Sequence, residues 1–129
     1  MKVIILEGSK SKGKTTTLQM LYAVLITNKA EVQCPPSLVG DKDFETVLIY
    51  RNKKVAIFSQ GDYTKNCKEA IAKYADSVDV LIMAHSSDLA ELKVPLPHTS
   101  QVIQKTEVDD PLSRMKANAD DCRTLENAI

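Results

Sequence analysis

Apolar positions along the chain form short uninterrupted runs in some places and helical stripes in others. The runs KVIILE (2–7) and DVLIMA (79–84) are rich in aliphatic residues and are followed by a glycine and a histidine. Such runs are typical of strands that are buried on both faces of a parallel sheet. Between them, TVLIY and KVAIFSQ flank the turn RNKK, which predicts an antiparallel hairpin at about 46–60.

Three segments repeat apolar residues at the spacing of a helix face, at 15–28, 64–75 and 111–129. The last segment follows Asp110 and begins with Pro111, a capping side chain and a proline that suits the first helical position. We expect this last helix to pack its apolar face on the sheet. That face comprises Leu112, Met115, Ala119, Cys122, Leu125 and Ile129.

Weaker signals complete the predicted order of elements. AEVQC (30–34) predicts a strand that ends at the prolines 35–36, because proline cannot donate to a central ladder. The polar stretch 37–45 predicts a loop, and QVIQKTEV (101–108) predicts another strand. The alternation of strands and helices predicts one α/β domain over 1–129, a three-layer α/β/α sandwich with a mostly parallel sheet.

Composition excludes several classes of protein. The 129 residues have a formal net charge of zero and are 43% hydrophobic, which is ordinary for a folded domain. Dedicated nucleic-acid or membrane-surface binders usually carry a basic excess, so we expect neither. No apolar run approaches the ~20 residues of a membrane span. The three cysteines form no CxxC pair, which favours reduced thiols and a cytoplasmic protein.

The clearest chemical signal lies between the first predicted strand and the first predicted helix. There GSKSKGKT fits the pattern GxxxxGK[ST] from Gly8 to Thr15. Two glycines let the backbone turn tightly and bring its N–H groups close to an anion, and the helix N-terminus adds a positive partial charge. Lys14 supplies a full positive charge, and the Thr15 hydroxyl is a suitable ligand for Mg²⁺. The spacing therefore predicts a phosphate-binding loop.

GSKSKGKT resembles the Walker A motif of P-loop NTPases, and the predicted order of elements is compatible with that superfamily. The resemblance implies that ATP, or another nucleoside triphosphate, binds here together with Mg²⁺. It also implies that Lys14 stabilises charge on the γ-phosphate during catalysis and that Thr15 holds the metal. The implied nucleotide contacts are Gly8, Ser9, Lys10, Ser11, Lys12, Gly13, Lys14, Thr15 and Thr16.

A second signature of these proteins, an aspartate after an apolar strand, is altered in this chain. In VAIFSQGD, comparison with the DxxG of Ras-like GTPases puts Ser59 in place of the aspartate and Asp62 in place of the glycine. We still predict that Asp62 binds the metal and takes part in catalysis, because it follows a strand near the sheet edge where ligands collect. Its alternative role is to cap the helix that starts at Thr64.

Other polar residues are candidates with simpler explanations beside them. Asp41 and Asp43 lie in the predicted loop, where solvated acids need no function, and Glu7 precedes the first glycine. ILEGSKSKGKTTTL is also locally similar to the phosphate-binding loop of thymidylate-kinase-like enzymes. His85 and Ser86 follow a strand expected beside the first one, where they resemble the sensor position of additional-strand ATPases. Ordinary polarity at a strand end explains them equally well.

Missing motifs narrow the function. The chain lacks an NKxD run, which disfavours a standard GTPase and favours ATP. Its three arginines, Arg51, Arg114 and Arg123, make no arginine-rich lid, and we expect the last two on the solvated face of the last helix. The leading hypothesis is a Mg²⁺-dependent, nucleotide-binding P-loop protein that is a slow NTPase or a nucleotide switch.

Two alternatives stay open. The first is a small phosphotransferase whose acceptor, a nucleoside, nucleotide or other small molecule, is held by the 37–45 and 85–100 loops. The second is a non-catalytic nucleotide-binding module. In that case the last helix would contact a protein partner or a second copy of the chain.

Overall fold

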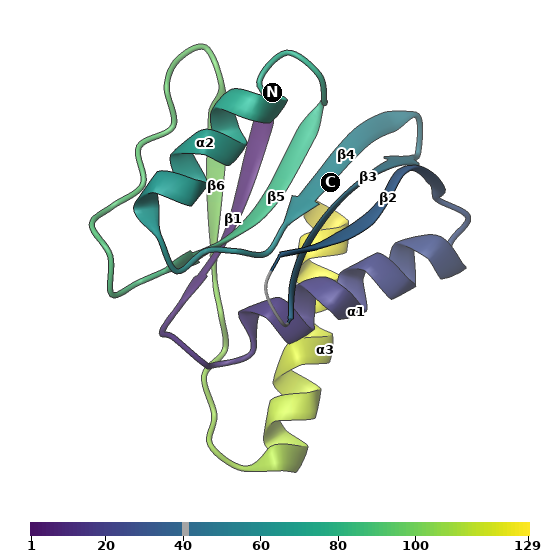
Figure 1. Cartoon of the computed structure of the whole chain (residues 1–129). Helices are drawn as coiled ribbons and strands as arrows, with labels where there is room; N and C mark the ends of the chain where they lie inside the picture. The colour runs from purple at the N-terminus through teal and green to yellow at the C-terminus, as the bar shows by residue number, and fades with distance from the viewer. Residues whose placement is uncertain (40–41) are drawn as a thin grey trace.

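A six-stranded mixed sheet with helices on both faces forms the structure, a computed structural model that describes residues 1–39 and 42–129 (Figure 1). The chain is therefore an α/β protein, as its apolar pattern predicts. In chain order the elements are β1 (Lys2–Gly8), α1 (Lys14–Thr27), β2 (Glu31–Val39), β3 (Asp43–Tyr50), β4 (Lys53–Phe58), α2 (Thr64–Tyr74), β5 (Val80–Ser86), β6 (Thr99–Gln104) and α3 (Pro111–Ala128).

The strands lie in the order β2-β3-β4-β5-β1-β6. The pairs β4–β5, β5–β1 and β1–β6 are parallel, whereas β2–β3 and β3–β4 are antiparallel. The predicted hairpin is confirmed as β3 and β4. Strand β5 lies directly beside β1, as expected for the second apolar run, and it separates β1 from β4. The carboxyl ends of β1, β4, β5 and β6 consequently meet at one edge of the sheet.

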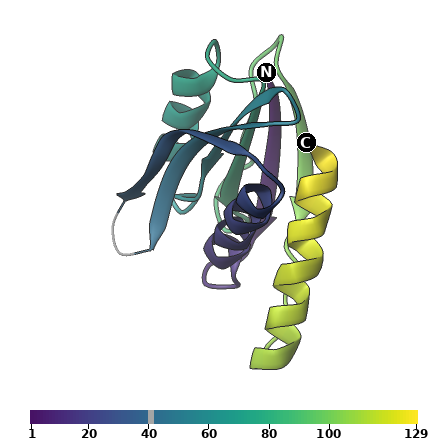
Figure 2. The same cartoon turned by 90° about the vertical axis from the view of Figure 1, so that its right-hand side faces the viewer.

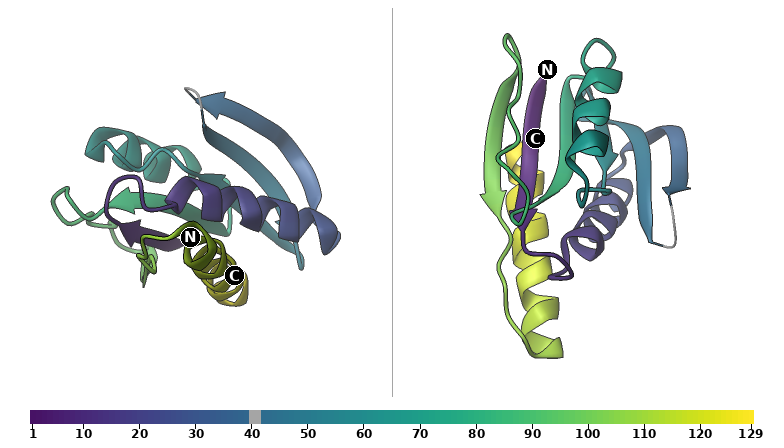
Figure 3. Two further views of the ribbon diagram at one scale, coloured as in Figure 1. Left: turned by 90° about the horizontal axis from the view of Figure 1, so that it is seen from below. Right: turned by 60° about the vertical axis from the view of Figure 1, so that its left-hand side comes forward.

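Each face of the sheet has its own core. Helices α1 and α3 pack against each other on one face, over alternate residues of β1 such as Ile4 and Leu6. Helix α2 covers the other face, over Val3 and Ile5. Figures 2 and 3 show this arrangement from the side and from below, with α1 and α3 next to each other and α2 on the opposite side. The alternation of β1 side chains between two covered faces explains its unbroken apolar run.

Strand β2 corrects the prediction for residues 30–45. It runs through Pro35 and Pro36 to Val39, and β3 already begins at Asp43, so most of the predicted 37–45 loop is strand. The prolines fit because β2 is an edge strand that pairs only with β3, and because its register shifts between Cys34 and Ser37. An edge strand can leave backbone positions without a ladder bond. The candidate Asp41 lies outside the described residues.

Helix α3 corrects the prediction of a continuous apolar face. Its second half is buried as expected, at Cys122 and Leu125, but Leu112 is 78% exposed and Met115 is 67% exposed. Figures 1 and 2 show the reason: the first turns of α3 extend past the end of the sheet and have nothing beneath them. Asp110 caps the helix as predicted, since its side chain accepts a bond from the backbone N–H of Ser113.

Candidate functional site

The loop between β1 and α1, residues 8–15, has the backbone shape that its sequence predicts. It leaves β1 at the carboxyl edge of the sheet and enters α1 at Lys14. The φ angle is +61° at Ser11 and +97° at Gly13. Left-handed residues within such a turn point successive N–H groups toward one side, which is the geometry of an anion-binding nest. The N-terminus of α1 adds its partial positive charge at the same place.

Close contacts at both motif glycines, together with the positive φ at Gly13, favour glycine at these positions. A Cβ atom on Gly13 would lie 2.8 Å from Oδ1 of Asn118, and one on Gly8 would lie 2.7 Å from Cβ of Lys105. Asn118 belongs to α3, and its Oδ1 also accepts a 3.3 Å bond from the hydroxyl of Thr17 in α1. The last helix therefore supports the loop from behind.

Lys14 occupies the centre of this site and is only 6% exposed. Its Nζ donates to the backbone carbonyls of Gly8 (2.9 Å) and Ser9 (2.8 Å). Burial lowers the pKa of Lys14, and the carboxylates nearby, Asp62 foremost, act in the opposite direction. A buried ammonium held by carbonyls rather than by a carboxylate keeps its full charge available for an added anion.

Asp43, from the segment predicted to be a loop, lies next to the motif. Its Oδ1 accepts bonds of 3.0 Å from the hydroxyls of Thr15 and Ser59. The Ser59 Oγ in turn accepts a 2.8 Å bond from the backbone N–H of Phe44, which fixes its position. Ser59 is the residue that the comparison with the DxxG pattern sets in place of the aspartate. The structure thus brings a carboxylate to this place from β3 instead of β4.

Asp62 also faces this region, although its alternative role as a helix cap is wrong. Helix α2 has Tyr63 as its capping residue, and no described side chain forms a capping hydrogen bond with its first turn. Asp62 instead lines the same cavity as Lys14 and Thr15. That Asp62 binds a metal and takes part in catalysis remains a prediction.

These residues surround a cavity of about 390 Å³, which we call the loop cavity. Five of the nine predicted nucleotide contacts line it, and Gly8, Ser9, Lys10 and Lys12 do not. The lining residues are Ser11, Gly13, Lys14, Thr15, Thr16, Lys42, Asp43, Ser59, Asp62 and Arg114.

Arg114 is the lining residue that sequence reasoning placed wrongly. It lies in the first turn of α3 and reaches the loop cavity instead of the solvated face of the helix. Its Nε donates to the carbonyl of Val108 (3.0 Å), and its terminal nitrogens make no hydrogen bond to another described residue. Helical periodicity alone could not indicate this, because the first turn of α3 extends past the sheet and meets the motif loop there.

No family model, no curated protein and no solved structure matches this chain. Within residues 1–39 and 42–129, no helix is both long and apolar enough for a membrane span.

Carboxylates hold the first half of the motif loop. Glu107 Oε1 accepts a 2.6 Å bond from the N–H of Ser9, and Asp88 Oδ2 accepts a 3.4 Å bond from the N–H of Lys10. The bond from Ser9 lowers the pKa of Glu107. These contacts use the N–H groups of Ser9 and Lys10, which do not line the loop cavity. They do not use the N–H groups in the second half of the motif loop, which does line it.

The remaining candidates, Glu7, His85 and Ser86, lie away from the loop cavity. His85 is fully buried, and its Nδ1 lies 3.2 Å from Oε2 of Glu7 on the neighbouring strand. By strand alternation Glu7 lies on the sheet face that α2 covers, opposite α1. The Ser86 hydroxyl donates to Asp88 over 3.4 Å. Ser86 pairs with Gly8 at the start of the motif loop, but neither His85 nor Ser86 lines the loop cavity, so the resemblance to a sensor position remains a prediction.

Proposed function

We propose that this chain is a P-loop protein that binds a nucleoside triphosphate with Mg²⁺ and acts as a slow NTPase or a nucleotide switch. The observation that supports it most strongly is Lys14, a buried ammonium that lines the loop cavity beside a turn with two left-handed residues and a helix N-terminus. Three positive features aimed at one cavity fit a polyphosphate.

Each residue has a role in this proposal. Backbone N–H groups of residues 11–15 hold the inner phosphates, and Lys14 moves from its carbonyl partners to the terminal phosphates. Arg114, which also lines the cavity, adds a further positive charge that would stabilise the negative charge developing when a terminal phosphoryl group is transferred. ATP is favoured over GTP because the chain lacks an NKxD run.

The oxygen donors around Thr15 fit Mg²⁺. The Thr15 hydroxyl and the carboxylates of Asp43 and Asp62 line one cavity, and oxygen is the donor that Mg²⁺ prefers. The described residues hold no group of three or more His, Cys, Asp or Glu that could bind a metal by themselves. A Mg²⁺ ion here would accordingly take its other ligands from phosphate oxygens and water, which is usual at nucleotide sites.

The test is a titration of the purified protein with ATP and GTP, each with and without Mg²⁺, while phosphate release is followed in the same samples. We expect Mg²⁺-dependent binding of ATP at micromolar concentration, and we expect Lys14→Ala to abolish it. Lys68→Ala, which removes an exposed lysine of α2, is the matched control and should bind as the wild type does. Equal affinity of the wild type and Lys14→Ala would refute the proposal.

The phosphotransferase alternative gains one supporting observation. Lys42 and Asp43, which belong to the 37–45 segment expected to hold the acceptor, line the loop cavity itself. Transfer of the γ-phosphate to a nucleoside in a panel of small acceptors would favour this alternative over the NTPase.

A further inference from the structure

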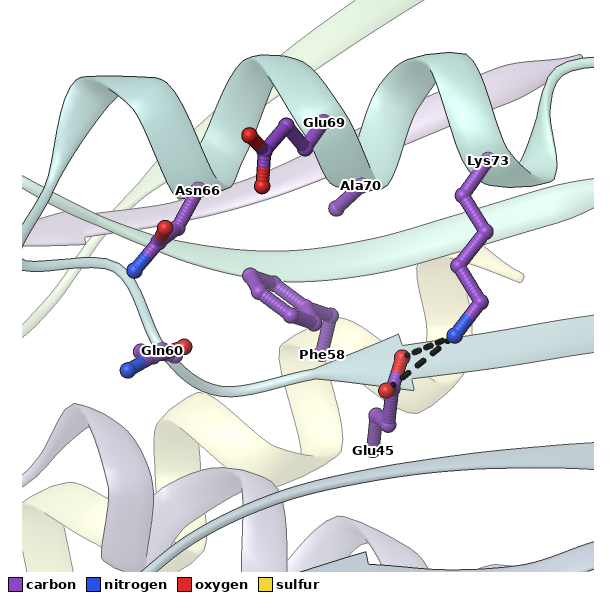
Figure 4. Close-up of a pocket in the computed structure, with 7 residues that line it drawn as sticks. All are labelled: Glu45, Phe58, Gln60, Asn66, Glu69, Ala70 and Lys73. Carbon is purple, nitrogen blue, oxygen red and sulfur yellow. Dashed lines mark hydrogen bonds and ion pairs between the residues drawn. The ribbon is translucent and has the colours of Figure 1, made fainter. Parts of the chain in front are cut away.

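A second cavity lies on the sheet face that α2 covers, between α2 and the end of β4, and we call it the α2 cavity. Its volume is about 220 Å³. Figure 4 shows α2 above it and the aromatic ring of Phe58 below, with Ala70 pointing toward the ring. The lining residues are Glu45, Phe58, Gln60, Asn66, Glu69, Ala70 and Lys73.

At one end of the α2 cavity the polar side chains already bond to one another. Both carboxylate oxygens of Glu45 accept bonds of 3.1 Å from Nζ of Lys73, and Oε2 accepts a further 2.6 Å bond from the hydroxyl of Tyr74. Figure 4 shows the Glu45–Lys73 pair closing this end. Burial and the bond to Glu45 raise the pKa of Tyr74, so this hydroxyl stays a donor. This end therefore has little capacity left for a ligand.

The other end holds polar groups that are not used. The side-chain amides of Gln60 and Asn66 make no hydrogen bond within the described part of the chain, and both are only partly exposed. Figure 4 shows them gathered at the same end, with the side chain of Glu69, which is 63% exposed, extending along α2 toward Asn66. Glu69 has one ion pair, a 3.8 Å contact with Lys65 across one helical turn.

The lining residues that α2 contributes are spaced so that they lie on one face of the helix. Asn66, Glu69, Ala70 and Lys73 are separated by three, four and seven positions, so they share one side of the helix. Opposite them the ring of Phe58 is only 8% exposed and is held by the core of that face. Away from the Glu45–Lys73 pair, the cavity thus combines an apolar floor with two amides and one carboxylate.

We propose that the α2 cavity binds the base of a free nucleoside whose ring carries an amino group, of the cytosine type. The volume is smaller than the roughly 300–1,000 Å³ of pockets for drug-sized ligands, which suits a single ring. A carboxylate accepts from the exocyclic amino group of cytosine, and amides pair with a donor–acceptor edge. The zero net charge of the chain favours a free nucleoside over a nucleic-acid polymer.

The site is independent of the proposed function, because a base in the α2 cavity needs no triphosphate in the loop cavity. The test measures binding of cytidine and uridine to the intact protein without ATP, by calorimetry or by chemical-shift changes of Asn66 and Gln60. We expect cytidine to bind at least about tenfold more tightly than uridine. The reason is that the carboxylate of Glu69 can accept a hydrogen bond from the amino group of cytosine, which uracil lacks. Glu69→Gln should reduce that preference by about tenfold, and Asn66→Ala should weaken both nucleosides.

Lys65→Ala is the matched control, because it removes the ion pair of Glu69 without removing a side chain that lines the α2 cavity. It should keep the preference for cytidine. No cytidine binding at millimolar concentration, equal binding of the two nucleosides, or an unchanged preference in Glu69→Gln would each overturn the proposal. Tighter binding of an oligocytidine than of cytidine would also overturn it, in favour of a polymer ligand.

The two proposals fail separately. Cytidine binding that persists in Lys14→Ala, with no ATP binding to the wild type, would leave the α2 cavity assigned and the nucleotide proposal refuted. ATP binding that requires Lys14, with no cytidine binding, would refute only the proposal for the α2 cavity.

Discussion

Replacing Gly13 by alanine should destabilise the fold through two separable effects. The first is conformational: φ is +97° at Gly13, and a side chain in that region costs about 1–2 kcal/mol. The second is steric, because the new Cβ would lie 2.8 Å from Oδ1 and 3.3 Å from Nδ2 of Asn118. Overpacking of a filled site costs roughly 1–3 kcal/mol. Together they predict a loss of about 2–5 kcal/mol in the free energy of unfolding.

A double-mutant cycle separates the two effects. Asn118→Ala removes the amide that the new methyl group would strike, at the cost of a 3.3 Å bond from Thr17. In that background Gly13→Ala should cost only the conformational part, about 1–2 kcal/mol. The assay is urea denaturation of the four proteins, followed by circular dichroism, with the slope compared among them. Equal costs of Gly13→Ala in both backgrounds would refute the steric reasoning, and a cost below ~0.5 kcal/mol would refute both parts.

Two further predictions concern titration and thiol chemistry. Because folding lowers the pKa of Lys14, this residue binds more protons in the unfolded chain just below pH 10.5 and by itself makes the free energy of unfolding rise with pH. Folding raises the pKa values of Tyr74 and the buried cysteines, which makes the free energy of unfolding fall with pH in the same range. In urea denaturation Lys14→Met should therefore lose stability more steeply with rising pH than the wild type. Burial raises the pKa of Cys67 to about 11 and also raises that of Cys122, whereas Cys34 is exposed. Iodoacetamide at pH 8 should therefore modify Cys34 first, as mass spectrometry of the digested protein would show, and equal labelling of all three would contradict this burial.

Local signals predicted the parts of the fold that depend on neighbouring residues. The run before Gly8, the motif and the stripe of α1 follow one another along the chain, and the structure has β1 and α1 at those positions. The cap at Asp110 likewise depends only on residues within one turn of it, and the prediction is confirmed. The hairpin of β3 and β4 could also be predicted, because its turn and its apolar strands are adjacent.

The errors arise where the answer depends on distant parts of the chain. Prolines 35–36 end a central strand but not an edge strand, and only the sheet order makes β2 an edge. Arg114 and Met115 could not be assigned to a side of α3, since the first turns of that helix extend past the sheet. The contact of Asp43 with Thr15 joins positions 28 residues apart and left no local pattern. These long-range contacts supply half of the candidate site.

The support that α3 gives to the motif loop has a consequence for synthesis of the chain. Thr17 and its partner Asn118 are 101 positions apart, so at about 5–20 residues per second the ribosome makes them roughly 5–20 s apart. During that interval Gly13 lacks the amide that packs behind it, and Gly8 lacks Lys105. The motif loop can therefore reach its complete packing only after α3 has been made and has docked.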